Sequence, residues 1–200
     1  AESAATAATD SLSSAAAVVA TSKAVAAASV APFRSPENIA RNADRHPVET
    51  LAFFGLRDDM TVIEALPGGL WYTEILAPVL RDRGRLVVGS YDLDAPGVVD
   101  YQRSAHQTLL RRIEQEPEVF GRVLTFRSTH GWLNAGVAGA VYRAFFEVLK
   151  PGGVLGVVQH RAGPKTNREA FSGYVPEETV IALAEQAGFV LEARSEINAN

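Results

Sequence analysis

The stretch TVIEALPGGLWYTEIL, residues 61–76, decides the fold of this 200-residue chain. Residues 60–66 form an apolar run with the length of a buried strand, and Pro67-Gly68-Gly69 ends it. A helical pattern then covers residues 71–83 and stops at Gly84. The stretch therefore predicts a buried strand, a glycine-containing turn and a helix.

The same alternation continues along the chain. Further strands are predicted at 85–91, 122–127, 154–159 and 189–197, and helices at 98–116, 138–150 and 176–188. Three helices are predicted before the first strand: residues 10–30 with Asp10 as N-cap, a short helix begun by Ser35-Pro36-Glu37, and residues 47–54 before Gly55. Apolar strands alternating with amphipathic helices predict an α/β fold, with a parallel sheet covered on both faces.

Composition excludes several classes of protein. Apolar residues make up 47% of the chain and charged residues 21%, which predicts a packed core rather than disorder. A net charge of -4 gives no reason to expect nucleic acid as a partner, and no apolar run is long enough for a membrane span. There is no cysteine, and the four histidines lack metal-ligand spacing, so we expect no metal site.

The N-terminal region is rich in alanine. Residue 1 is Ala, and Ala fills 14 of the first 31 positions, which is typical of an exported, periplasmic protein whose signal peptide has been removed. The alternative is a cytoplasmic protein cut at an arbitrary point. We expect a helical arm at 1–34, followed by one domain at 35–200. Because such an arm buries little surface alone, we expect it to dock in a homodimer.

Three segments in this order resemble the class I S-adenosylmethionine (SAM)-dependent methyltransferases. They are the stretch at 61–76, RLVVGSYD at 85–92 and FFEVLKPGGVLGVV at 145–158. Residues 40–200 are similar, more narrowly, to a group of predicted bacterial methyltransferases that often carry signal peptides. The resemblance implies a three-layer Rossmann-like sheet with helices on both faces, SAM as cofactor and S-adenosylhomocysteine (SAH) as product.

The resemblance also implies a set of cofactor contacts. Glycines let the backbone approach the methionine part of SAM, and an acid after the second strand accepts hydrogen bonds from the ribose. Asp92 is the first candidate for that acid and Asp94 the second. The turn departs from the family pattern because Leu70 replaces a glycine. The implied cofactor-binding residues are Glu64, Pro67, Gly68, Gly69, Tyr72 and Asp92.

The family sheet contains two strands that this sequence does not show. One would lie between Asp92 and the strand at 122–127, and the other would follow the last strand. Without them the sheet would expose its edges, so we expect missing segments near 121–123 and after 200. A reduced version of the fold is the alternative.

Candidate catalytic residues follow the strands at 122–127 and 154–159, because ligands bind beyond the carboxyl ends of parallel strands. We expect His130, or else His160, to be a general base, and Arg127 or Arg161 to bind an acidic substrate. Trp132 is a candidate for stacking on the substrate or sulfonium. The structural alternatives are a backbone-bonded His130, a packed Trp132, and an Arg161 paired with Glu169 or Glu177.

These residues favour a transferase that moves a methyl group from SAM to a small-molecule acceptor, by positioning and a histidine base. The alternative is an exported methyltransferase-like fold that acts as a ligand-binding module or in SAM-independent chemistry, since SAM is a cytoplasmic metabolite. An NAD-binding Rossmann protein is least favoured, because its three spaced glycines are missing here.

Overall fold

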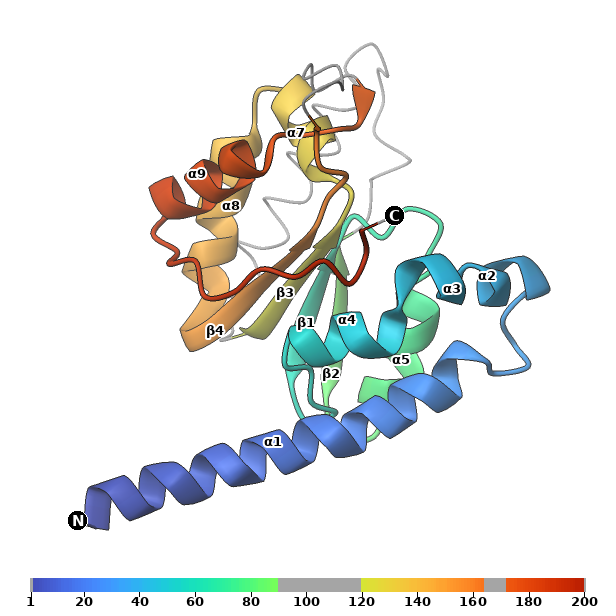
Figure 1. Ribbon diagram of the computed structural model, residues 1–200, viewed down its shortest axis with the longest axis vertical. Coiled ribbons are helices and arrows are strands. Elements are labelled where there is room, and N and C mark those ends of the chain that lie inside the picture. Colours follow the sequence, from blue (N-terminus) through green and yellow to red (C-terminus); the bar gives the residue numbers. More distant parts are fainter. Residues whose placement is uncertain (1, 90–119, 164–171, 200) are drawn as a thin grey trace. The chain divides into compact units, whose positions relative to one another are not determined.

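The computed structural model of the chain describes residues 2–89, 120–163 and 172–199, with side chains from residue 14 onward (Figure 1). These residues form two compact units. The helical unit comprises Ala1–Met60, Leu70–Leu86 and Ser195–Asn200, and the sheet unit comprises Thr61–Gly69 and Val87–Arg194.

A four-stranded parallel sheet is the centre of the fold, which confirms the predicted α/β class. The strand order is β2-β1-β3-β4. The strands are β1 (Thr61–Ala65), β2 (Arg85–Gly89), β3 (Phe120–Phe126) and β4 (Leu149–Val158). In register, Ala65 pairs with Thr125, which pairs with Val157, so these three side chains lie on one face of the sheet.

The described part of the sheet unit also contains the helices α7 (Thr129–Asn134), α8 (Ala138–Val148) and α9 (Glu177–Ala187). Figure 1 shows α8 and α9 side by side. Helix α8 is strongly amphipathic and buries Val141, Tyr142 and Phe145 in the core of this unit. Strand residues Ile63 and Val123 lie in the same core, so the predicted apolar runs form its central layer.

The helical unit contains α1 (Glu2–Ser29), α2 (Pro36–Ala40), α3 (Asn42–Arg45), α4 (Pro47–Phe53) and α5 (Thr73–Leu80). The C-terminal half of α1 packs on α4 and α5 and buries Val25 and Ala28. Helix α2 begins as predicted: the Ser35 hydroxyl accepts a hydrogen bond from the backbone N–H of Asn38, and Pro36 occupies the first turn.

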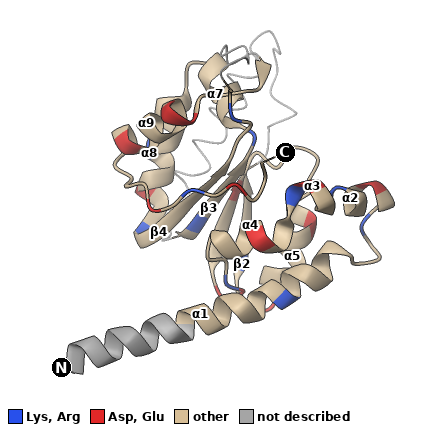
Figure 2. Ribbon diagram, viewed as in Figure 1, with Lys and Arg blue, Asp and Glu red and all other residues tan. Residues whose placement is uncertain are grey.

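Helix α1 begins at Glu2, eight residues before the predicted N-cap Asp10. The alanine-rich residues before Asp10 also have a high helix propensity, so the helix extends through them. From residue 14 on, Lys23 is its one charged residue (Figure 2). None of the described helices is both long and apolar enough to cross a membrane. The predicted homodimer stays a prediction.

The predicted strand at 189–197 is wrong. Residues 189–196 have no regular secondary structure, and Val190 is 88% exposed. Phe189 instead packs edge-on against Phe146 of α8, with ring centroids 5.1 Å apart. The sequence pattern predicted a strand, but a strand also needs a neighbouring strand with which to form hydrogen bonds.

Helix α7 was not predicted, whereas the helix predicted at 98–116 lies outside the described residues. Residues 121–123, near which a missing segment was expected, lie within β3. Helix α3 was also not predicted as a separate helix, and β4 begins at Leu149, within the helix predicted at 138–150. The remaining strands and helices lie where the sequence predicted them, with ends that differ by a few residues.

Candidate functional site

The strand order places a reversal point between β1 and β3. From β1 the chain continues to β2 on one side, whereas β3 and then β4 lie on the other side of β1. In open parallel sheets, ligands bind beyond the carboxyl ends of the strands at such a point. The residues that directly follow β1 and β3 are therefore the first place to look for a site.

The turn after β1 holds an unusual backbone. Leu66 has a φ of 52°, Gly68 of 59° and Leu70 of 61°, so three of five consecutive residues are left-handed. The Leu66 N–H donates to the carbonyl of Gly89 at the end of β2, at 2.8 Å. Left-handed leucine is unfavourable by about 1–2 kcal/mol, and such strain is concentrated at functional sites.

The glycines of this turn leave open space beside the backbone. No described atom lies within 4 Å of the position that a Cβ would take on Gly68 or Gly69. Gly69, unlike Gly68, has a backbone that other residues adopt readily. A ligand can therefore approach this backbone closely, and a side chain introduced at Gly69 would occupy the same space.

A second left-handed residue follows β3. Arg127 has a φ of 63°, and its N–H donates to the carbonyl of Val158 at the end of β4, at 2.7 Å. Its side chain is exposed and makes no ion pair with any described residue. The carboxyl ends of both β1 and β3 thus carry strained non-glycine residues, each held by a hydrogen bond to the neighbouring strand.

Helix α7 follows Arg127 and carries His130 in its first turn. The Nδ1 atom of His130 is buried and has no hydrogen-bond partner among the described residues. The backbone-bonded alternative for this nitrogen is therefore not observed. A buried ring nitrogen without a partner has an unused hydrogen-bonding capacity, which a group that reaches it can satisfy.

Trp132 lies in the core of the sheet unit. Its side chain has no exposed surface and packs edge-on against Tyr142 and Phe145, at centroid distances of 6.2 and 5.6 Å. The packing alternative is therefore confirmed for Trp132, and its indole has no surface to offer a substrate.

The hydroxyl of Tyr142 is buried beside this tryptophan. It lies 2.9 Å from the Thr129 hydroxyl, with which it shares a hydrogen bond. Burial raises the pKa of Tyr142 to about 12, and the contact with Thr129 acts in the opposite direction. Tyr142 is therefore neutral at physiological pH and serves packing rather than proton transfer.

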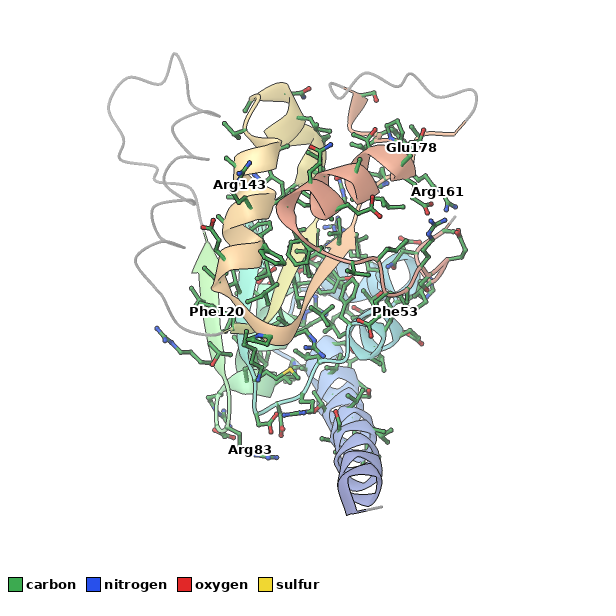
Figure 3. The ribbon with its side chains drawn as sticks, turned by 90° about the vertical axis from the view of Figure 1, so that its left-hand side faces the viewer. Phe53, Arg83, Phe120, Arg143, Arg161 and Glu178 are labelled. Atoms are coloured by element: carbon green, nitrogen blue, oxygen red, sulfur yellow. The ribbon has the colours of Figure 1, made fainter. Side chains whose placement is uncertain are left out.

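At the end of β4, His160 is exposed, and its ring centroid lies 5.4 Å from that of Tyr174. Arg161 forms an ion pair with Glu177 at 3.0 Å, which confirms one of the predicted alternatives. Figure 3 shows Arg161 beside the first turn of α9, where Glu178 is labelled. Glu177 also binds Arg194, at 3.2 Å, so its carboxylate joins two arginines.

The other residues that were predicted to contact the cofactor lie in different parts of the structure. Glu64 lies within β1 with 1% of its surface exposed, and Pro67 is half-buried. Tyr72 belongs to the helical unit, where it is 4% exposed and its hydroxyl donates to the carbonyl of Arg45 at 3.1 Å. Asp92 and its alternative Asp94 lie outside the described residues.

Two polar groups that the sequence did not single out lie at the same ends of the sheet. Thr125 Oγ1 and Gln159 Oε1 are buried and have no hydrogen-bond partner among the described residues. Thr125 is the next-to-last residue of β3, and Gln159 directly follows β4. Their positions at or directly after the strand ends were the feature of the sequence that could have identified them.

The described residues contain no cluster of three potential metal ligands. A scan against protein-family models and a search of curated proteins found no match for this chain. The features that bear on function are therefore those at the carboxyl ends of β1, β3 and β4.

Proposed function

We propose that the protein is a class I SAM-dependent methyltransferase, with a three-layer Rossmann-like sheet, that acts on a small-molecule acceptor. The observation that carries the proposal is the pair of strained turns, at Leu66 and Arg127, on the two sides of the reversal point. A fold maintains unfavourable backbone where a site needs it.

The strand order supports the Rossmann-like part of the proposal. The classic doubly wound order is 3-2-1-4-5-6. The observed order β2-β1-β3-β4 equals its 2-1-4-5 portion if one further strand occurs between β2 and β3 in the sequence. The family has such a strand between Asp92 and β3, although this sequence does not show it.

The backbone of the turn supports the choice of cofactor. The family places glycines where this chain has Leu70, yet Leu70 adopts the left-handed backbone that glycine favours. Leu70 therefore has the backbone that a glycine at this position would allow. Gly68 and Gly69, with open space beside them, would lie against the methionine part of SAM. Glu64 is the next-to-last residue of β1 and so lies at the carboxyl end of the same strand.

SAM, when bound, supplies a methyl group on a sulfonium that an acceptor oxygen or nitrogen can attack in line. His130 takes the proton that the acceptor releases, because its Nδ1 has no partner among the described residues. Arg127 binds an acidic group on the acceptor, since Arg161 is already engaged by Glu177. His160 is the second candidate for the base.

Isothermal titration calorimetry with SAM and SAH tests this proposal on the intact chain. We expect wild-type protein to bind both, and Gly69→Val to lose binding because its side chain fills the space beside the turn. Gly139→Val is the matched control. A Cβ on Gly139 would also have no described atom within 4 Å beyond its chain neighbours and its own helix backbone, but Gly139 lies in α8. Folded wild-type protein that binds neither compound would refute the proposal and favour the binding-module alternative.

A further inference from the structure

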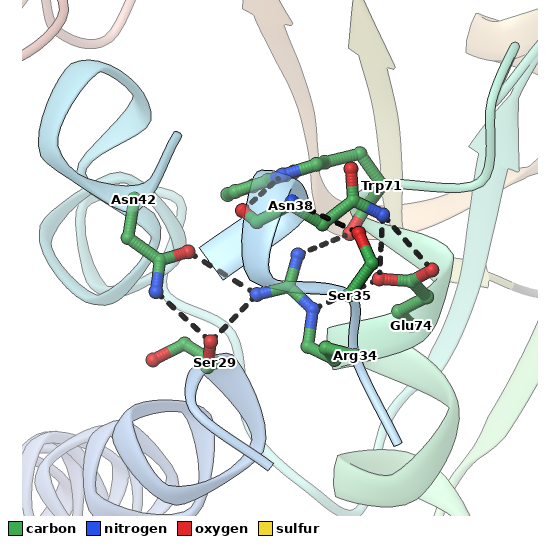
Figure 4. A network of polar contacts seen from close by, with 7 residues as sticks. All are labelled: Ser29, Arg34, Ser35, Asn38, Asn42, Trp71 and Glu74. Atoms are coloured by element: carbon green, nitrogen blue, oxygen red, sulfur yellow. Dashed lines mark hydrogen bonds and ion pairs between the residues drawn. The ribbon is translucent and has the colours of Figure 1, made fainter. Parts of the chain in front are cut away.

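Arg34 is a buried arginine that the site described above does not use. It lies between α1 and α2, and its side chain has no exposed surface. Its Nε donates to Glu74 Oε2 at 2.9 Å, and its Nη1 donates to the Ser29 carbonyl at 2.7 Å and to Asn42 Oδ1 at 3.1 Å (Figure 4). Its Nη2 donates to the carbonyl of Trp71 at 3.3 Å. A buried guanidinium is tolerated only when it is matched in this way.

Trp71 is fixed by this network at both its backbone and its side chain. Its indole N–H donates to the carbonyl of Asn38 at 2.9 Å, and Figure 4 shows this bond beside the guanidinium of Arg34. The guanidinium carbons of Arg34 and Arg45 lie 4.7 and 4.6 Å from the centre of the ring. The residue is 3% exposed, so these contacts are shielded from water.

Glu74 closes the network from the first turn of α5. Its two carboxylate oxygens each accept from the Asn38 amide at 3.1 Å, in addition to the bond from Arg34. The backbone N–H of Glu74 donates to the carbonyl of Leu70 at 2.9 Å. Arg34 therefore contacts both Trp71 and Glu74, the residues that hold the C-terminal side of Leu70.

We propose that Arg34 is a positioning residue that keeps Leu70, the residue at which the chain leaves the turn after β1, in its left-handed conformation. This inference rests on the proposed function of the turn as the cofactor-binding segment. The Leu70 side chain is 48% exposed and gives its backbone little anchorage. The residues that follow Leu70 therefore have to hold its strained conformation. Arg34 bonds to two of these residues, Trp71 and Glu74.

Amide hydrogen exchange on the full chain tests the inference without a ligand. Arg34→Lys keeps the charge but removes the planar fork, and Arg81→Lys, at an exposed pair with Asp82, is the matched control. For Arg34→Lys we expect the amides of Glu74 and Leu76, bonded to Leu70 and Tyr72, to exchange about tenfold faster. The amides of Gly84 and Arg85 should be unchanged.

Equal acceleration at all four amides would indicate general destabilisation and overturn the inference, as would no acceleration at all. If Arg34→Lys does not fold, Glu74→Gln removes the same ion pair at a half-buried position. The same two amides must then exchange faster, again with Gly84 and Arg85 unchanged, and any other pattern counts against the inference.

Calorimetry with two probes connects the network to binding. SAH contains the methionine part that the turn would contact, whereas adenosine lacks it. We expect Arg34→Lys to weaken SAH binding about tenfold or more and to leave adenosine binding unchanged. Equal weakening of both probes would overturn the positioning role. Wild-type protein that binds no SAH would refute the proposed function, and the exchange experiment alone would then decide the role of Arg34.

Discussion

Strain at Arg127 can be measured by comparing two variants that both lack the guanidinium. Arg127→Ala keeps a Cβ at a φ of 63°, whereas Arg127→Gly removes it. Left-handed backbone costs an alanine about 1–2 kcal/mol, and glycine loses about 0.5–1 kcal/mol more conformational entropy on folding. The glycine variant should therefore be more stable than the alanine variant by about 1 kcal/mol.

Urea and thermal unfolding of both variants provide the assay. A difference of about 1 kcal/mol corresponds to about 2–4 °C in Tm for a chain of this size. Gly136→Ala is the reciprocal control, because Gly136 has a φ of 69° and no described atom near its Cβ position, so it should lose a similar amount. If Arg127→Ala is as stable as Arg127→Gly, the backbone at the end of β3 is not strained, and the prediction is wrong.

Three further predictions concern the core, the end of α9 and the arm. Burial raises the pKa of Tyr142 to about 12, whereas an exposed tyrosine in the unfolded chain has a pKa of about 10. The neutral hydroxyl of Tyr142 therefore contributes fully to stability below about pH 10, and this contribution is lost as the pH rises through about 12. Tyr142→Phe should flatten this alkaline loss in urea unfolding measured from pH 9 to 12, and an unchanged slope would count against it. Gly188→Ala should cost about 2 kcal/mol or more, because φ is 111° and the new Cβ would lie 2.8 Å from Phe146 Cζ; a Tm within error of wild type would contradict this. Light scattering of the full chain should give twice 21.4 kDa if the N-terminal helix dimerises, and the monomer mass would exclude it at that concentration.

The strands and most helices were predictable because their signals are local. Apolar runs marked β1 to β4, Ser35 and Pro36 marked the start of α2, and Gly55 and Gly188 marked helix ends. Helix α7 gave no such signal, since THGWLN has weak helix propensity. Its formation depends on Trp132, which inserts into a core that the sequence alone does not define.

The candidate site was predictable only in part. The glycine turn and the segments after β3 and β4 were found because parallel strands end at one edge. The left-handed backbone at Leu66, Leu70 and Arg127 has no signature in the sequence, because these residue types rarely adopt it. The bond between Arg34 and Glu74 spans forty positions and depends on how the chain after α1 packs on α5.

The proposed function requires SAM to bind over the turn that follows β1. A crystal structure of the full chain grown with SAH would show whether it does. We expect density for the amino-acid end of SAH against the backbone of Gly68 and Gly69, with Leu66 and Leu70 left-handed as they are here. An empty turn in protein saturated with SAH, or SAH bound elsewhere on the chain, would contradict the claim.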